Sequence, residues 1–429
     1  MKRSVTRDEP HRTQPVGLRI AIVTQYFWPE IFRINDLAAA LVSRGHHVQV
    51  LTGQPNYPSG TFADGYGAIV PRRDAALGAH VTRVPLIPRG SGSGFRLCIN
   101  YLSFATAATV LGPALIRGPV DVVLAYEPSP VYVAAPALAL ARSKRAPALM
   151  WVQDLWPETL VAMGLLTNGR LQAVASATTG ALHRGMDALL VQSEAFRPPL
   201  IAQRVMAEHI FYVPNWAEHY YRVVEIPADA PERREMPRGF TVLFAGNVGE
   251  SQGLDVLIGA ADRLRHLQDL HWVVLGEGRR LNWLREQVER RALGDRVHLL
   301  GRRPPETMPS WFALADVLLA TLQPDPVYEM TIPSKLQTYL ASGRPVVAAM
   351  NGEGARVVQA AGAGATAPAG DAVSLAAAVE ELHNTSPESR ARMGRSGREY
   401  YEMHFARDKI IDRIEGLLLR YAGHGGDSL

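Results

Sequence analysis

Cysteine and lysine are both scarce in this chain of 429 residues. A single cysteine, Cys98, excludes an internal disulfide and a cysteine-rich metal site, so a reducing compartment is the simple interpretation. Only Lys2, Lys144, Lys335 and Lys409 stand among the 45 basic residues, and the others are arginine. An internal lysine in such a chain is present either by chance or for a specific function.

The chain also lacks a strong excess of either charge. The 45 basic and 41 acidic residues give a net charge of +4, which is too little for a dedicated nucleic-acid binder. No nucleic-acid partner is expected, and the balance suits anionic small molecules or a membrane surface. With 47% hydrophobic and 20% charged residues, the composition is that of a globular protein and excludes a disordered or collagen-like chain.

A secretory signal is missing, because residues 1–17 are polar and have no apolar core. We expect a disordered leader there. Residues 97–116 form one long uncharged run between Arg96 and Arg117, long enough to span a bilayer. The run contains several polar residues and Pro113. We therefore expect a buried or interfacial helix here in preference to a membrane span.

Several catalytic and cofactor motifs are absent. The first predicted strand is not followed by Gly-x-Gly-x-x-Gly, which counts against an NAD enzyme. The chain has no P-loop and no Gly-x-Ser-x-Gly elbow. It also lacks His-Glu-x-x-His and Asp-x-Asp, so no cofactor and no metal site is expected.

Short apolar runs alternate with helical stretches, which predicts α/β domains with mostly parallel sheets covered on both faces. The strands expected in the first half are 19–24, 47–52, 81–84, 121–126, 148–153 and 188–192. A proline-rich, charged stretch at 214–237 then reads as a linker or long connection. The strands expected after it are 240–245, 271–275, 297–300, 317–321 and 345–349.

This pattern predicts two tandem Rossmann-like, doubly wound domains. We place a leader at 1–17, a first domain at 18–205, a second at 206–395 and a C-terminal helical segment at 396–429. Ligands of open α/β sheets bind beyond the carboxyl ends of the strands. Two such sheets facing each other would form a cleft with a loop-built site on each wall.

The first half offers two candidate side chains at strand ends. Arg33 lies in the loop between the first strand and the following helix, where it either approaches a phosphate or is simply solvated. Asp154 follows an apolar strand and could accept a hydrogen bond from a substrate hydroxyl or act as a base. Alternatively, Asp154 caps the helix announced by Pro157 and Glu158.

The second half of the chain offers more candidate binding residues. Gly246, Asn247 and Gly249 form a strand–turn–helix junction that suits a phosphate or a sugar hydroxyl. Glu277 lies in a second strand-end turn and either binds a ribose or base or only forms a tight turn. Ser334 and Lys335 follow Pro333 at a predicted helix N-terminus, where a phosphate would gain amide hydrogen bonds, dipole attraction and an ammonium group.

Together these motifs resemble family 4 glycosyltransferases of the WbuB-like polysaccharide group. The matching segments are 26–30 (YFWPE), 33–36 (RIND), 44–46 (RGH), 51–58 (LTGQPNYP), 151–157 (WVQDLWP), 214–218 (PNWAE), 246–247 (GN), 252–255 (QGLD) and 333–337 (PSKLQ). The likeness runs in order from about residue 18 to about 410.

The resemblance implies a GT-B fold and retaining, metal-independent transfer from a nucleotide sugar. It implies that the first domain takes the acceptor, the second takes the donor, and a final helix crosses back to the first. Arg33, Asn35 and Asp36 would then lie on the acceptor side or near the diphosphate. Asp154 would orient the acceptor or the sugar.

The sequence departs from the broad family at its donor contacts. Asn247 and Gln252 occupy the positions of the family's diphosphate-binding Arg and Lys. The usual ribose-binding glutamate falls on Thr338, and its partner falls on Met330, beside Glu329. Our hypothesis is that Lys335 and the amides around it bind the diphosphate instead, with Glu329 as a catalytic carboxylate.

By resemblance the donor is a UDP-sugar, the transferred group a hexosyl or N-acetylhexosaminyl residue, and the acceptor a lipid-linked or other saccharide. The run 97–116 and the arginines around it would attach the protein peripherally to the inner face of the cytoplasmic membrane. Two alternatives stay open: a sugar-nucleotide epimerase of the same fold, and an inactive sugar-nucleotide-binding scaffold.

Overall fold

The computed structural model describes residues 17–67, 69–90, 94–162, 164 and 166–423. The predicted leader therefore lies almost wholly outside the described residues. The chain forms two compact units. The first takes in the described residues up to Tyr126, Tyr132–Leu149 and the segment from Leu417, and the second takes in Glu127–Val131 and Met150–Gly416. The domain limits expected from the sequence stay predictions.

The first sheet has eight strands in the order β3-β4-β2-β1-β5-β6-β7-β8. Their bounds are β1 Arg19–Val23, β2 His47–Gly53, β3 Arg72–Ala76, β4 Ala79–Val84, β5 Val122–Glu127, β6 Ala148–Val152, β7 Ala188–Val191 and β8 Ile210–Tyr212. β1 pairs in parallel with both β2 and β5, and only the edge strand β3 is recorded as antiparallel, to β4. The central strands are continuously buried, as parallel strands covered on both faces must be.

Helices connect these strands, as the alternating pattern predicts. They are α1 Arg33–Ser43, α2 Gly94–Leu115, α3 Ala134–Lys144, α4 Glu158–Ala162, α5 Gly169–Arg184 and α6 Arg197–Ala202. α2 packs along α3 and against β2 and β4. Within the described residues, α2 is the one helix long and apolar enough to cross a membrane. Only 28% of its most apolar stretch of 18 residues is buried.

The second sheet has six parallel strands in the order β11-β10-β9-β12-β13-β14. Their bounds are β9 Phe240–Ala245, β10 Leu270–Leu275, β11 Val297–Leu299, β12 Val317–Thr321, β13 Val346–Ala349 and β14 Gly364–Ala367. The helices of this part are α7 Glu232–Glu235, α8 Asp255–Arg263, α9 Leu281–Arg290, α10 Met308–Leu314, α11 Pro326–Glu329, α12 Ser334–Ala341, α13 Gly352–Ala360, α14 Ala372–Asn384, α15 Pro387–His404 and α16 Arg407–Tyr421.

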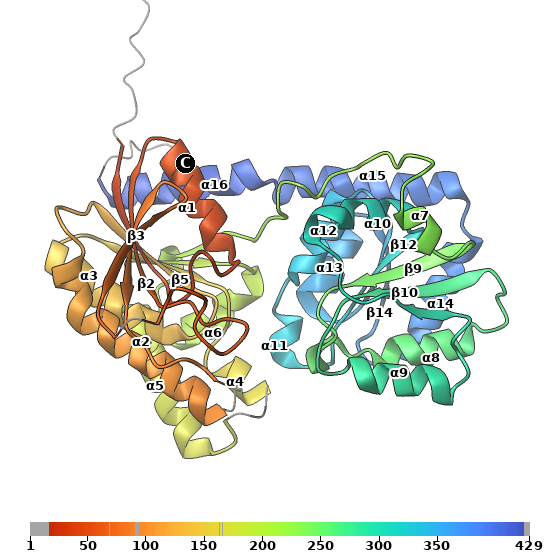
Figure 1. Ribbon diagram of the computed structural model, residues 1–429, viewed down its shortest axis with the longest axis horizontal. Helices are drawn as coiled ribbons and strands as arrows, with labels where there is room; N and C mark the ends of the chain where they lie inside the picture. The colour runs from red at the N-terminus through yellow and green to blue at the C-terminus, as the bar shows by residue number, and fades with distance from the viewer. Residues whose placement is uncertain (1–16, 68, 91–93, 163, 165, 424–429) are drawn as a thin grey trace, which may run out of the picture. The chain divides into compact units, whose positions relative to one another are not determined.

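Two separate cores cover the two faces of the second sheet, because successive strand residues point to opposite sides. Val242 and Phe244 of β9 pack with α8, α9 and α14. Leu243 and Ala245 pack with α10, α12 and α13 on the other face. Figure 1 shows α8 and α9 below this sheet and α10 and α12 above it. The helices on both faces confirm the predicted doubly wound architecture.

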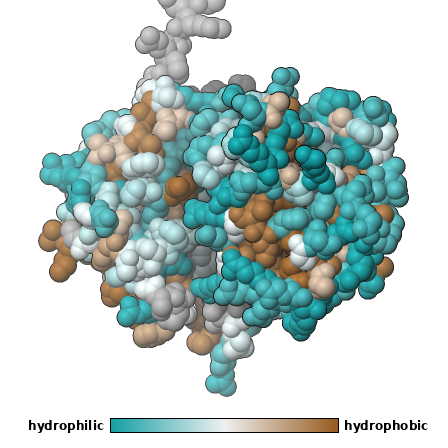
Figure 2. Space-filling view, turned by 45° about the vertical axis from the view of Figure 1, so that its right-hand side comes forward, coloured by the Kyte–Doolittle hydropathy of each residue, from teal (hydrophilic) through white to brown (hydrophobic). Residues whose placement is uncertain are grey.

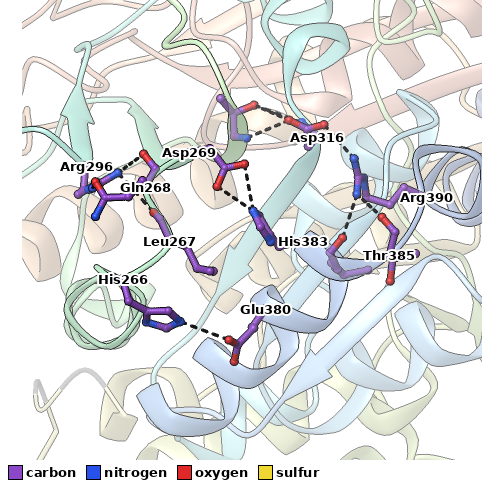
Figure 3. A network of polar contacts seen from close by, with 12 residues as sticks. His266, Leu267, Gln268, Asp269, Arg296, Asp316, Glu380, His383, Thr385 and Arg390 are labelled. Carbon is purple, nitrogen blue, oxygen red and sulfur yellow. Dashed lines mark hydrogen bonds and ion pairs between the residues drawn. The ribbon is translucent and has the colours of Figure 1, made fainter.

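A polar network joins α14 and α15 to the amino-terminal end of the second sheet (Figure 3). The Asp269 carboxylate, just before β10, contacts His383 Nε2 at 3.0 Å, and this contact lowers the pKa of Asp269. Asp316, just before β12, accepts the amide of Thr241 at 2.9 Å and lies 3.5 Å from Arg390. This network is structural and leaves the opposite, carboxyl end of the sheet to form a site.

The visible surface is mostly hydrophilic with smaller hydrophobic patches (Figure 2). The large hydrophobic side chains that stay exposed include Phe95, Leu102 and Val110 of α2. No charged side chain separates Leu102 from Val110 along the helix. α2 is therefore neither a fully buried helix nor an ordinary charged surface helix.

Every strand expected from the sequence is present, with ends shifted by no more than two residues. The stretch 214–237 is a long connection, as predicted, and contains only the short α7. β3, β8 and β14, which are short or polar, were not expected from the sequence. β8 carries the first sheet to Tyr212, beyond the residue 205 that we gave as the end of the first domain.

Candidate active site

Lys335 is the central side chain at the carboxyl end of the second sheet. Its Nζ donates to Gln252 Oε1 and lies 3.7 Å from the centre of the Phe244 ring. Burial holds the pKa of Lys335 well below its usual range, because an ammonium loses hydration there and, among the described residues, gains a neutral amide and a ring face but no counter-charge. A bound anion would supply the missing counter-charge.

Glycines let the two strand-end loops approach this lysine. A side chain on Gly246, where φ is +132°, would place its Cβ 2.8 Å from Lys335 Cε. A Cβ on Gly276, after β10, would lie 1.9 Å from the carbonyl oxygen of Gly246. The two loops therefore touch backbone to backbone, and the amide of Val248 donates to the carbonyl of Glu277 at 2.8 Å.

α12 points its N-terminus at the same place. Pro333 precedes the helix, and no side chain caps its first amides, although helix N-termini usually find a partner for them. Ser334 at the first position is exposed. Amides without a side-chain cap, the positive end of the helix dipole and a partly buried lysine are the features that would stabilise an oxyanion here.

Tyr339 fixes the position of α12 against the sheet. Its buried hydroxyl accepts the amide of Ala245 at 3.0 Å and donates to the carbonyl of Ala245 at 3.2 Å. Ala245 is the last residue of β9 and immediately precedes Gly246. One side chain therefore sets the distance between the helix N-terminus and the glycine loop.

The other residues predicted to bind the sugar donor differ in their exposure and in their contacts. Asn247 and Glu277 are exposed in the two loops, with Gly249 beside them. Thr338 is buried, and its hydroxyl donates to the carbonyl of Ser334 at 3.2 Å. Glu329 ends α11 and accepts a hydrogen bond from Asn351 Nδ2 at 3.0 Å. The structure thus joins Lys335, Gln252 and Gly246 directly, whereas Thr338 bonds to its own helix.

A second group of polar side chains lies at the carboxyl ends of β5 and β6 in the first sheet. Asp154 follows β6, and burial raises its pKa to about 7. Glu127, the last residue of β5, is completely buried, and neither of its carboxylate oxygens makes a hydrogen bond of normal geometry with the described residues. Burial and the nearby Asp154 carboxyl raise the pKa of Glu127 well above its usual range.

Sequence reasoning missed Glu127 and the amides around it. Gln153 Oε1 accepts from Asn215 Nδ2 at 2.8 Å, and the Gln153 carbonyl accepts from Gln192 Nε2 at 3.4 Å. The remaining Gln153 Nε2, Gln192 Oε1 and Asn215 Oδ1 atoms are buried without partners among the described residues. The only sequence signal was a polar residue directly after each apolar strand.

The loops after β1 and β2 are tied together by Glu30. Its Oε1 accepts the amides of Asn56 and Tyr57 at 2.8 and 2.7 Å, and burial raises its pKa to about 7. Asn35 accepts the amide of Trp28 at 3.1 Å and donates to the carbonyl of Glu30 at 2.7 Å. Asn35 therefore shapes this loop.

Arg33 and Asp36 both lie in the first turn of α1, whose N-cap residue Phe32 makes no side-chain capping bond. This places the predicted arginine at a helix N-terminus, where anions are stabilised. Within the described ranges, no group of three or more His, Cys, Asp or Glu residues is placed to hold a metal ion. Metal independence stays a prediction.

Comparison with known proteins gives consistent results. Residues 32–216 match the family described as glycosyl transferase 4-like domain, and residues 239–385 match glycosyl transferases group 1. The colanic acid biosynthesis glycosyl transferase WcaI of Escherichia coli K12 is 26% identical over 337 residues, which is 76% of this chain and 82% of that protein.

Solved structures share the fold. HepE of Anabaena in complex with UDP has a TM-score of 0.69 at 15% identity, covering 94% of this chain and all of that one. A UDP-forming trehalose-phosphate synthase of Burkholderia vietnamiensis has a TM-score of 0.70 at 14% identity, covering 95% and 98%. The chain belongs to the family 4 glycosyltransferases and has the GT-B fold. The narrower WbuB-like group stays a prediction.

Proposed function

We propose that this glycosyltransferase transfers a hexosyl or N-acetylhexosaminyl group from a UDP-sugar, with retention of configuration, to a lipid-linked or other saccharide acceptor in surface polysaccharide synthesis. The observation that carries the donor proposal is Lys335, a lysine with a depressed pKa at an uncapped helix N-terminus beside two glycine loops. The UDP and UDP-glucose complexes of HepE support the choice of nucleotide. The relative WcaI supports the polysaccharide role.

In this proposal the diphosphate lies between the α12 amides and Lys335. As the bond from the sugar to the diphosphate breaks, negative charge grows on the leaving phosphate, and the ammonium and the amides stabilise it. The leaving phosphate takes the proton of the acceptor hydroxyl on the same face of the sugar, so no covalent nucleophile is needed. Asp154 orients the acceptor by accepting a hydrogen bond, and Glu329 is the proposed carboxylate near the donor sugar.

Calorimetric titration with a panel of UDP-, GDP- and dTDP-sugars, without added metal, tests the donor proposal. The wild type should bind one nucleotide class selectively. Lys335→Met keeps the apolar stem of the side chain but loses the charge, and should bind about 10- to 100-fold more weakly, the equivalent of one charge-assisted hydrogen bond of about 1.5–3 kcal/mol. Unchanged affinity would refute a role for Lys335 at the diphosphate.

Lys409→Met is the matched control, because Lys409 is exposed on α16, and it should bind as the wild type does. Product analysis separates the alternatives. A transferase consumes the sugar nucleotide only when an acceptor is present and releases the nucleotide. An epimerase would alter the sugar nucleotide without an acceptor, and an inactive scaffold would bind it unchanged.

A further inference from the structure

A cavity lies within the first compact unit, and the residues that line it are not part of the candidate active site. Its volume is about 590 Å³, and strands β1 to β4 and the chain just after α2 line it. This is within the usual size range of small-molecule sites. Arg19 and His47, which begin β1 and β2, are part of the lining. The cavity therefore lies toward the amino ends of these strands, whereas substrates of such sheets bind at the carboxyl ends.

Strand pairing puts the basic lining residues of the strands on one face of the sheet and Asp74 on the other. Arg19 is paired with His47, and Gln49 is paired with His80, and paired residues of neighbouring strands share a face. Along β2 the burial alternates, with His47 exposed and Gln49 partly buried while Val48 and Val50 are buried. One face of β2 thus packs in the core, and the other carries polar side chains at its start.

The lining is strongly cationic. It contains three arginines and two histidines but only one acid, Asp74. The Asp74 carboxylate already forms ion pairs with Arg72 and Arg83, at 2.8 and 2.9 Å. These two arginines do not line the cavity. The His47 and His80 rings lie side by side, with centres 5.2 Å apart. The acid is therefore already neutralised and does not offset the other cations.

The arginines differ in how many of their donors the protein already uses. Arg19 is paired with Asp121. Among the described residues, Arg73 makes one long hydrogen bond, of 3.4 Å, to the carbonyl of Leu115 at the end of α2, although a guanidinium has five N–H donors. Arg117 is exposed, and its carbonyl is held by Gln49 Nε2 at 3.0 Å. Within the described part of the chain, most N–H donors of the Arg73 and Arg117 guanidinium groups, which line the cavity, have no protein partner.

We propose that this cavity is a binding site for a phosphate-bearing anion, a phosphomonoester or a diphosphate, held by Arg73 and Arg117 with His47 and His80 beside it. Guanidinium groups bind phosphate through paired N–H donors. The anion is either a free phosphate compound or a lipid headgroup, since the exposed apolar side chains of α2 lead toward Leu115. The proposal goes beyond the transferase function and does not depend on it.

Histidine NMR on the full-length protein tests the site directly. Protein labelled with ¹³C at histidine Cε1 is titrated with inorganic pyrophosphate at constant ionic strength, and the His47 and His80 signals are assigned by His47→Gln and His80→Gln. Both signals should shift saturably. In the Arg73→Gln/Arg117→Gln variant the apparent Kd should rise at least tenfold. If that variant does not fold, Arg117→Gln alone, at an exposed residue, serves instead.

The charge-matched control is Arg285→Gln/Arg290→Gln, at two exposed positions of the helix α9, which packs against the second sheet. This variant should titrate as the wild type does. Flotation with phosphatidylcholine vesicles, with or without phosphatidic acid, distinguishes the two sources, because the headgroup of phosphatidic acid is a phosphomonoester. Loss of phosphatidic acid binding in the Arg73/Arg117 variant assigns the site to a lipid headgroup, and unchanged vesicle binding assigns it to a free anion. Absence of a saturable shift, or an equal shift in the Arg73/Arg117 variant, would overturn the proposal.

Discussion

Asp154 shows what a single residue gains from its place at the end of a buried strand. Because burial raises its pKa to about 7, the carboxylate form grows as the pH rises through neutrality. The same burial acts more strongly on Glu127, which lies at the end of the neighbouring β5. One negative charge in this buried place disfavours a second.

We expect the transfer rate to depend on this titration. If the Asp154 carboxylate accepts the substrate hydroxyl, kcat/KM should rise with pH up to about 7 and then level off. Asp154→Asn should lose at least about 100-fold in kcat/KM and show no such rise. The pH–rate profiles of both proteins measure this, with Glu158→Gln as a nearby control. A profile for Asp154→Asn that keeps the wild-type rise would assign the titration to another group.

At the scale of elements, the donor site depends on the contact between one helix and one strand. α12 carries Ser334 and Lys335, and Tyr339 attaches this helix to the last residue of β9. The glycines at 246 and 276 then allow the loops after β9 and β10 to meet. These contacts together hold the N-terminus of α12 next to the loop after β9.

Tyr339→Phe should therefore affect both stability and donor binding. The variant leaves the buried amide and carbonyl of Ala245 without their hydroxyl partner, which should cost about 1–3 kcal/mol of unfolding free energy. Because α12 loses its fixed position, the donor KM should rise more than kcat falls. Denaturant unfolding and donor-saturation kinetics measure the two effects. A destabilised variant with an unchanged donor KM would show that Tyr339 only supports the fold.

At the scale of the whole molecule, α2 is the element that we propose to bind a membrane. Its exposed Phe95, Leu102 and Val110 and the arginines at its ends combine apolar area with positive charge, which together give peripheral binding to anionic lipid. We propose that the protein acts at the inner face of the cytoplasmic membrane, where a lipid-linked acceptor would be held.

Vesicle flotation tests this proposal. Binding to phosphatidylglycerol vesicles should fall as salt rises, because the Debye length shortens. Leu102→Ser/Val110→Ser should bind more weakly at every salt concentration. Val373→Ser, at an exposed valine of α14, should behave as the wild type does. Equal binding of all variants, or no binding to anionic vesicles, would contradict membrane attachment through α2.

Local patterns in the sequence were enough to determine the class of fold. Apolar runs of four to six residues between helical stretches predicted the strands, because buried parallel strands leave a continuous hydrophobic signal. The position of Lys335 at a helix N-terminus could also be predicted from neighbouring residues, because Pro333 indicates the start of a helix. Weak signals failed at β3, which is polar, and at β8, which has three residues.

Only the tertiary structure decided which of these residues meet. Lys335 and Gln252 are 83 positions apart and become partners because β9 and α12 pack together. In the sequence, Glu127 does not differ from other polar residues that follow a strand, and only the structure shows that it is completely buried. The cationic cavity combines four strands and the end of α2. Strand order and register, which no local pattern encodes, bring the basic residues of these strands to one face of the sheet.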